Sequence, residues 1–183
     1  MAPGDGARRL PRRSKPRSTR LAMIKTDDQP DVEGWSYENR QRKIQFDEDS
    51  VRGFISLAWK DLASEWDFGV VISNDRAVRD ANRRYRDVAR ATDVLSFPTG
   101  DGMPYTRLDG YIGDLLISAG RAARQAKQHD HSVSDEIKIL VLHGLLHLLG
   151  FDHEIDGGEM REFETVLRCK YGLPAGLIER ESN

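Results

Sequence analysis

The chain centres on one stretch, His143-Gly144-Leu145-Leu146-His147-Leu148-Leu149-Gly150-Phe151-Asp152-His153, which holds three of its five histidines. Because an α-helix has about 3.6 residues per turn, His143 and His147 project from the same helix face. Gly150 can end that helix in a left-handed turn, which brings His153 back toward the other two rings. Three converging imidazoles without an obvious fourth protein ligand are typical of a catalytic zinc site, which keeps one position open.

The residues around the two helical histidines are apolar on nearly every side, as expected of a buried helix. They are Ile137, Leu140, Val141, Leu145, Leu148 and Leu149. A lone histidine in such a helix is more often a hydrogen-bonded core residue, and two at this spacing can share a face by coincidence. The third histidine beyond the glycine favours a metal, because buried imidazoles need polar partners.

The spacing His-x3-His-x2-Gly-x2-His matches that of the metzincin peptidases, which carry a glutamate base directly after the first histidine. That position is Gly144 here, and no carboxylate lies between His143 and His147. The pattern therefore keeps the metal geometry and disfavours ordinary metzincin peptide hydrolysis.

Length and composition indicate one globular domain, since the chain has 183 residues, of which 38% are hydrophobic and 32% charged. The single cysteine, Cys169, excludes a disulfide framework within the chain and favours a reducing compartment; we expect it to be a small core residue. No apolar run approaches the roughly 18 residues of a membrane span.

Charge is unevenly distributed along the chain. Of its 28 basic and 30 acidic residues, residues 1–25 hold eight basic and one acidic, which leaves 20 and 29 in the remainder, a formal charge of −9. We predict that residues 1–34 form a disordered basic tail. A solvated tail or a start at Met23 is favoured over a nucleic-acid-binding arm or an organelle-targeting segment, and the absence of an apolar h-region argues against a secretory signal.

Strand-like and helix-like segments alternate, which predicts an α/β (α+β) fold: one domain over residues 35–178, with a small mixed sheet packed with helices and the metal site on a central helix. The expected strands are 40–46, 68–73, 93–97 and 111–118. The expected helices are 48–66, 76–85, 119–129, one capped by Ser132 or Ser134 that carries the histidine pair, and 159–171. Residues 99–109 are expected to be loop.

Several further residues are candidates for chemistry. Arg86 ends a helix, and its guanidinium suits a phosphodiester because it binds phosphate oxygens in pairs. Asp152 is expected to orient an imidazole, to act as a base or only to stabilise the turn, and Asp114 to support a ligand histidine or to bond locally. The remaining candidates have structural or solvated interpretations. Asp93 is expected to be structural, Arg83 and Arg84 to be a solvated helix face, and His129 and His131 to be solvent-exposed.

The histidine stretch resembles the signature of the YbeY family of bacterial rRNA-maturation endoribonucleases, and two further blocks resemble that family in the same order. They are Asn82-x-x-Tyr85-Arg86 with Thr92-Asp93-Val94-Leu95-Ser96-Phe97-Pro98, and Gly113-Asp114 with Leu115-Leu116-Ile117-Ser118. The resemblance covers about residues 35–175. It departs from the family at Asp87-Val88-Ala89, where a Gly-Lys-Asp-like stretch is frequent.

The resemblance implies a cytoplasmic, single-strand-specific, zinc-dependent endoribonuclease that acts in 16S rRNA 3′-end maturation and ribosome quality control. It implies one Zn²⁺ held by His143, His147 and His153, and it matches Arg86 to the family's functionally important arginine. The implied partners are single-stranded RNA or rRNA, the small ribosomal subunit and assembly factors, with no membrane.

The expected catalytic residues are Arg86, as a clamp on the phosphate, and Asp152, as one candidate for proton handling. Zinc can lower the pKa of bound water from about 15.7 to about 7, and RNA also brings its own 2′-hydroxyl nucleophile. Two alternatives remain open at this point. One is a metal-dependent hydrolase of another substrate class, and the other is a non-catalytic ribosome-assembly factor stabilised by zinc.

Overall fold

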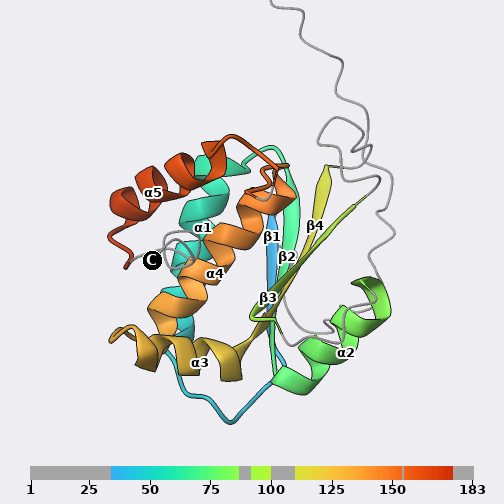
Figure 1. Cartoon of the computed structure of the whole chain (residues 1–183), viewed down its shortest axis with the longest axis vertical. Coiled ribbons are helices and arrows are strands. Elements are labelled where there is room, and N and C mark those ends of the chain that lie inside the picture. The colour runs from blue at the N-terminus through green and yellow to red at the C-terminus, as the bar shows by residue number, and fades with distance from the viewer. Residues whose placement is uncertain (1–33, 87–91, 100–109, 154, 175–183) are drawn as a thin grey trace, which may run out of the picture.

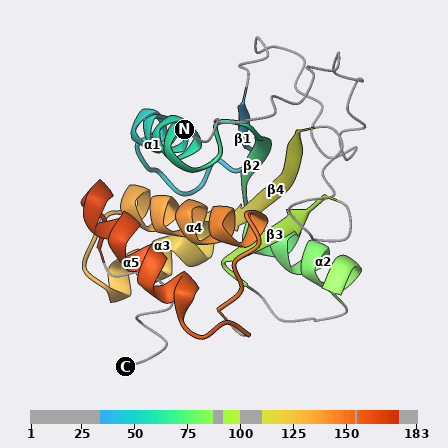
Figure 2. The same cartoon turned by 90° about the horizontal axis from the view of Figure 1, so that it is seen from above.

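A computed structural model describes residues 34–86, 92–99, 110–153 and 155–174. These residues form one mixed sheet with helices on both faces, in the order β1 α1 β2 α2 β3 β4 α3 α4 α5. Helices α1, α3, α4 and α5 lie on one side of the sheet, and α2 lies on the other (Figures 1 and 2). The predicted fold class, a single α/β domain with a small mixed sheet, is confirmed.

The sheet has the strand order β1-β2-β4-β3. Strands β1 (Trp35–Asn39), β2 (Asp67–Ser73) and β4 (Tyr111–Ser118) are parallel, with Tyr37 opposite Val70 and Val70 opposite Leu115. Strand β3 (Val94–Pro98) runs antiparallel to β4, with Ser96 opposite Leu115. Parallel neighbours need crossover connections, and α1 and α2 lie in those connections.

The central helix α4 (Val133–Leu148) is buried along most of its length because it contacts α1, α3, α5, β3 and β4. Its flanking helices are α1 (Glu48–Leu62), α3 (Ala119–Gln128) and α5 (Glu159–Tyr171). This surrounding explains why its sequence is apolar on nearly every side. Ser132 is the N-cap, accepting a hydrogen bond from the Asp135 N–H at 3.0 Å. Ser134 instead accepts the Asp47 N–H at 2.9 Å, which ties α4 to the start of α1.

Alternate residues of β3 and β4 face two separate cores. Leu115 and Ile117 belong to the main core beneath α4, whereas Leu95 packs with Val78 and Ala81 of α2 (Asp75–Arg86) on the other side. The pleat of a strand produces this division, since successive side chains point to opposite faces.

Strand β4 contains a bulge next to its glycine, Gly113. Asp67 lies opposite Tyr111 but Phe68 lies opposite Gly113, so one residue of β4 is extra. Gly113 has φ of 141°, and a Cβ there would lie 2.2 Å from the carbonyl oxygen of Phe97. Only glycine fits this close approach of the two strands.

The first predicted strand is wrong, because the strand is Trp35–Asn39 and not 40–46. After β1, Gln41 Oε1 accepts the backbone N–H groups of Lys43 and Ile44, and its Nε2 donates to the Ile44 carbonyl. A side chain thus binds the backbone groups that a strand would use for pairing. The first helix also ends earlier than predicted, at Leu62.

Cys169 is exposed on α5, so its expected place in the core is wrong. The tail predicted for residues 1–34 lies outside the described residues, except for Gly34. The loop expected at 100–109 and the domain end at 175–178 lie outside them as well. None of the described helices combines the length and the apolar character that a membrane crossing needs.

Candidate metal centre

The end of α4 returns the chain toward the helical histidines. Gly150, with φ of 98°, donates its N–H to the His147 carbonyl at 3.0 Å, and the Phe151 N–H donates to the Leu146 carbonyl at 3.1 Å. This pair of bonds is a Schellman motif, whose left-handed residue favours glycine. The predicted reversal at Gly150 is confirmed, and it carries His153 back over the last turn of the helix.

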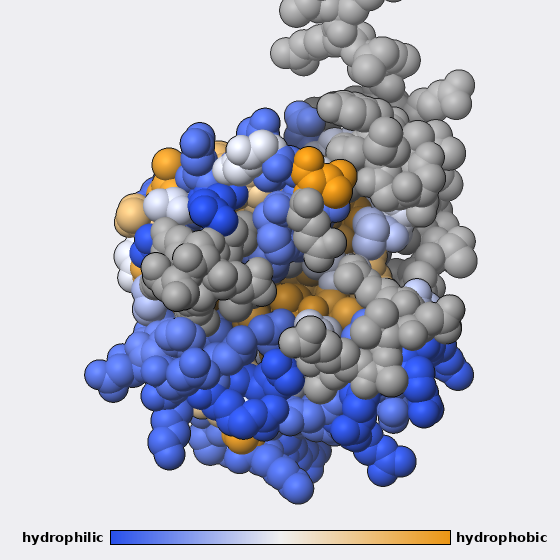
Figure 3. Space-filling view, viewed as in Figure 1, coloured by the Kyte–Doolittle hydropathy of each residue, from blue (hydrophilic) through white to orange (hydrophobic). Residues whose placement is uncertain are grey.

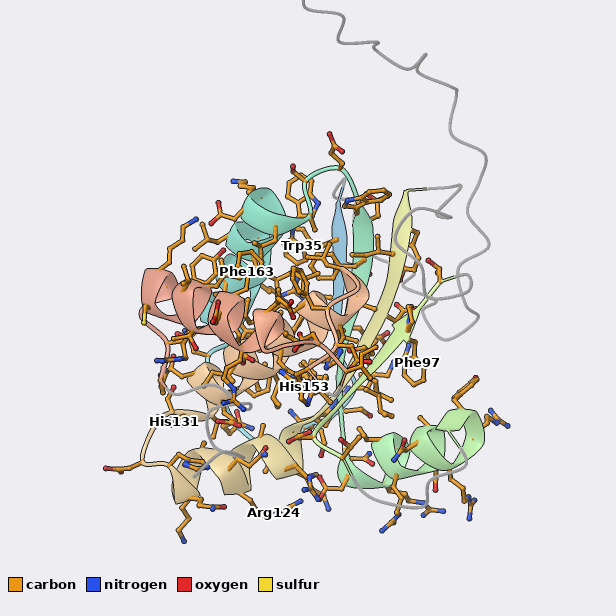
Figure 4. All side chains as sticks on the ribbon, turned by 45° about the horizontal axis from the view of Figure 1, so that its top comes forward. Trp35, Phe97, Arg124, His131, His153 and Phe163 are labelled. Carbon is orange, nitrogen blue, oxygen red and sulfur yellow. The ribbon has the colours of Figure 1, made fainter. Side chains whose placement is uncertain are left out.

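The three histidines form a compact triangle. Their ring centroids lie 4.8 Å apart for His143–His147 and 5.2 Å apart for each pair that includes His153. One ring nitrogen from each residue lies within 4.8 Å of the other two. Figure 4 places His153 near the middle of the molecule, on the side of β3 where α4 lies.

One edge of the triangle has the length expected around a zinc ion. Zinc–imidazole bonds of about 2.0–2.1 Å at tetrahedral angles put ligand nitrogens roughly 3.3 Å apart. The Nε2 atoms of His143 and His147 are 3.2 Å apart. Among the described residues, no Cys, Asp or Glu joins the cluster. A set of three imidazole nitrogens therefore fits a metal that keeps a further position open to substrate or solvent.

A buried carboxylate orients the first of these rings. Glu164 of α5 lies 3.3 Å from His143 Nδ1, and the exposed fractions of the two side chains are 4% and 8%. An Nδ1–H that donates to Glu164 leaves the lone pair on Nε2, which faces His147. Metal-binding histidines commonly have such a partner, because it sets the tautomer and the ring orientation.

The other two rings are both partly buried. Burial lowers the pKa of His147 to about 4, and the charges of His143 and His153 act in the same direction. Asp152 and a backbone hydrogen bond with Phe151 have the opposite, smaller effect. The ring is therefore neutral at pH 7. His153 Nδ1 is buried with no hydrogen-bond partner in the described ranges. Coordination to an ion is one way to satisfy a ring nitrogen of this kind.

Gly144 explains why this site lacks the metzincin-type glutamate. A Cβ at Gly144 would lie 2.8 Å from Leu115 Cδ2 and 3.3 Å from Ser96 Oγ, and Ser96 Oγ donates to the Gly144 carbonyl at 3.2 Å. The helix thus rests directly on β3 and β4. A glutamate there would clash with the side chains of Leu115 and Ser96.

The two predicted catalytic residues have different positions. Asp152 directly precedes His153, and its charge acts to raise the pKa of His147. The backbone carbonyl of Asp152 accepts the N–H of Asp156 at 3.0 Å. Arg86 is the last residue of α2, and its side chain lies outside what the structure describes.

Other candidates have structural roles. Asp114 accepts a hydrogen bond from the Tyr111 hydroxyl at 2.5 Å. Its neighbour Leu115 faces α4, so Asp114 faces the opposite side of the sheet and does not support a ligand histidine. Asp93 is structural as expected, since it accepts hydrogen bonds from the Val94 N–H and from Gln125 Nε2.

His129 is exposed as predicted, but the prediction for His131 is wrong. Only 8% of the His131 side chain is exposed, and its Nε2 lies 2.5 Å from Glu136, whose side chain is fully buried. A buried carboxylate needs a polar partner, and the turn before α4 folds His131 onto it. Glu164 was not among the residues that the sequence indicated. Its spacing from Met160 and Leu167, both buried, was the available signal that it lies on the inner face of α5.

Comparison with known proteins gives consistent matches. The family model described as Endoribonuclease YbeY matches residues 36–171. An Endoribonuclease YbeY from Solibacter usitatus is 43% identical over 148 residues, covering 81% of this chain and 95% of that protein. One from Helicobacter pylori is 45% identical over 119 residues, covering 65% and 81%. The solution structure of a Thermotoga maritima protein has a similar fold, with a TM-score of 0.50, 20% identity, and coverage of 72% of this chain and 84% of that one.

Proposed function

This chain belongs to the Endoribonuclease YbeY family and so has the role of an RNA-cleaving hydrolase, and from that premise we propose that it is a zinc-dependent endoribonuclease specific for single strands. The observation that carries the proposal is the triangle of His143, His147 and His153, with two ring nitrogens 3.2 Å apart. One zinc ion held there would activate water and polarise a phosphoryl oxygen.

The residues of the chain have separate roles in this proposal. Glu164 holds the proton on His143 Nδ1, so that Nε2 is free to act as a ligand. Arg86 binds the phosphate of the scissile bond through its guanidinium. We assign to Asp152, the residue before His153, the acceptance of a proton from the attacking group, whether that group is water or the 2′-hydroxyl of the RNA.

The cellular part of the proposal follows from the family resemblance. We propose a cytoplasmic role in 16S rRNA 3′-end maturation and ribosome quality control, with the small ribosomal subunit and assembly factors as partners. The catalytic domain is proposed to be residues 35–178. The basic segment 1–34 lies outside the 36–171 family match.

The test measures cleavage of single-stranded RNA together with zinc content for the wild type, His147→Ala and Arg86→Ala. We expect both variants to lose cleavage by about 100-fold or more, and only His147→Ala to lose the metal. His129→Ala is the matched control, because His129 is exposed outside the triangle. Full activity of Arg86→Ala would refute the phosphate clamp. Wild-type protein that holds zinc but leaves RNA intact would favour the assembly-factor alternative.

A further inference from the structure

Two aromatic side chains outside the histidine triangle, Tyr85 and Phe97, pack against each other at the surface. Tyr85, in the last turn of α2, is 47% exposed, and its ring centroid lies 5.4 Å from that of Phe97 at an interplanar angle of 72°. Phe97 is half-buried and packs at the edge of the small core of Val78, Ala81 and Leu95. This core fixes Phe97, and Phe97 in turn supports the exposed ring of Tyr85.

The Tyr85–Phe97 pair and the histidine triangle lie on opposite sides of strand β3. Ser96 faces α4 and bonds the carbonyl of Gly144, which directly follows His143. Phe97, the next residue of β3, points to the α2 side of the sheet. Figure 4 shows Phe97 and His153 on opposite sides of β3. Since β3 lies at the end of the strand order, its outer edge separates the two sites.

The helix that carries Tyr85 is basic, although the chain beyond residue 25 has a formal charge of −9. Arg79, Arg83 and Arg84 are exposed and form no ion pair within the described part of the chain, whereas Arg76 pairs with Asp80 at 3.7 Å. The surface over α2 and α3 is correspondingly hydrophilic (Figure 3). Free guanidinium groups beside an exposed aromatic ring complement a ligand that has both flat apolar rings and phosphates.

We propose that Tyr85, supported by Phe97, is a stacking platform for one unpaired base of the RNA substrate, and that Arg83 and Arg84 bind phosphates beside that base. The inference rests on the proposed function, because it takes RNA as the occupant. An RNA strand bound at Tyr85 would continue over the outer edge of β3 to the histidine triangle. A base can stack on Tyr85 only after it leaves a duplex, so the platform would select single strands.

The test compares binding of a short single-stranded RNA with binding of the same strand containing abasic sites. The proteins are the wild type, Tyr85→Ala, Tyr85→Phe and Leu57→Ala. Leu57 is a matched control, because it is 45% exposed and lies on α1, on the other side of the sheet. We expect Tyr85→Ala to weaken binding of the normal strand by about 5- to 100-fold and to leave the abasic strand unaffected. Tyr85→Phe and Leu57→Ala should bind both strands like the wild type.

The phosphate-binding role of the two arginines has a separate readout. Replacing Arg83 and Arg84 by Gln should weaken binding of both strands. It should also reduce the slope of log K against log salt by about 0.7 for each phosphate that the protein no longer neutralises. Circular dichroism of each variant verifies folding, which neither Tyr85 nor the two arginines should affect because all three are exposed.

The outcomes separate this inference from the proposed function. Equal affinity of Tyr85→Ala and the wild type for the normal strand, or an equal loss for both strands, would overturn the platform, even if the wild type cleaves RNA. Failure of the zinc-loaded wild type to cleave RNA would overturn the proposed function, while a base-dependent loss in Tyr85→Ala would still support the platform.

Discussion

Glu164 is the residue on which the orientation of the first ligand ring depends. Replacing it by Gln keeps its size but removes the charge that holds the proton on His143 Nδ1. We expect Glu164→Gln to lower zinc affinity by about 10- to 100-fold, in the range found for such supporting groups. A competition titration with a coloured chelator measures this affinity.

Glu162→Gln is the control for this prediction. Glu162 lies on the same helix but is exposed, so its loss should leave zinc affinity unchanged. If Glu164→Gln binds zinc as tightly as Glu162→Gln, the carboxylate has no role in holding the ligand ring.

The sequence shows individual ligands better than the groups that support them. Three histidines at a fixed spacing form a local pattern, because one helix turn and one glycine reversal bring them together. Glu164 is 21 residues from its partner, and an acidic residue in an amphipathic helix is usually solvated. Only the packing of α5 on α4 determines that this carboxylate points inward.

At the scale of elements, the site depends on how closely α4 approaches the sheet. Gly144→Ala would put a methyl group 2.8 Å from Leu115 Cδ2 in a packed core. Overpacking of this kind costs typically about 1–3 kcal/mol, and we expect that loss in the free energy of unfolding, measured by urea denaturation.

Gly53 of α1 provides a matched control for the same substitution. Apart from the neighbouring residues and backbone of its own helix, nothing lies within 4 Å of a Cβ built at Gly53, so Gly53→Ala should stabilise the protein by up to about 1 kcal/mol through helix propensity. If the two variants have the same stability, close contact between α4 and the sheet does not constrain position 144.

Asp75 links three elements and predicts a pH dependence. It accepts hydrogen bonds from Ser118, the last residue of β4, at 2.5 Å and from Arg124 of α3 at 2.7 Å. Burial raises the pKa of Asp75, but these two hydrogen bonds and the charges of Arg124 and Arg121 lower it below its usual 3.8. A lowered pKa means that the unfolded chain takes up the proton first as the pH falls.

The contribution of Asp75 to stability is therefore complete above about pH 3.8 and is lost as the pH falls through the lower pKa of the folded chain. We expect Asp75→Asn to lower the free energy of unfolding by about 1 kcal/mol at pH 7, and the difference from the wild type to disappear in strong acid. Asp80→Asn, which removes only an exposed pair with Arg76, should change stability by less than about 0.5 kcal/mol. A difference that persists unchanged in strong acid would contradict the assignment.

Element boundaries follow from sequence where local chemistry sets them. The strand Tyr111–Ser118 and the helix Glu159–Tyr171 are as predicted, because a run of apolar residues and a terminal glycine mark them. The strand expected at 40–46 fails because Gln41 binds the backbone there, while β1 is defined by pairing with β2, which no local pattern reveals. The number and mixed character of the strands were predictable, but their order was not.

At the scale of the whole molecule, zinc should stabilise the folded chain, because the three rings come together only in that state. Free zinc at 100 times its dissociation constant should raise the free energy of unfolding by about 2.7 kcal/mol. His147→Ala should lose this response and His129→Ala should keep it. Thermal unfolding with and without a chelator tests the prediction, and an equal zinc response in all three proteins would place the ion elsewhere.

The most direct test is a crystal structure of the natively purified protein, with anomalous diffraction recorded on both sides of the zinc absorption edge. We predict one zinc peak about 2.0–2.1 Å from a ring nitrogen of each of His143, His147 and His153, with the remaining coordination free of protein ligands. A zinc peak at another place, or a fourth protein side chain bound to the ion, would contradict this prediction.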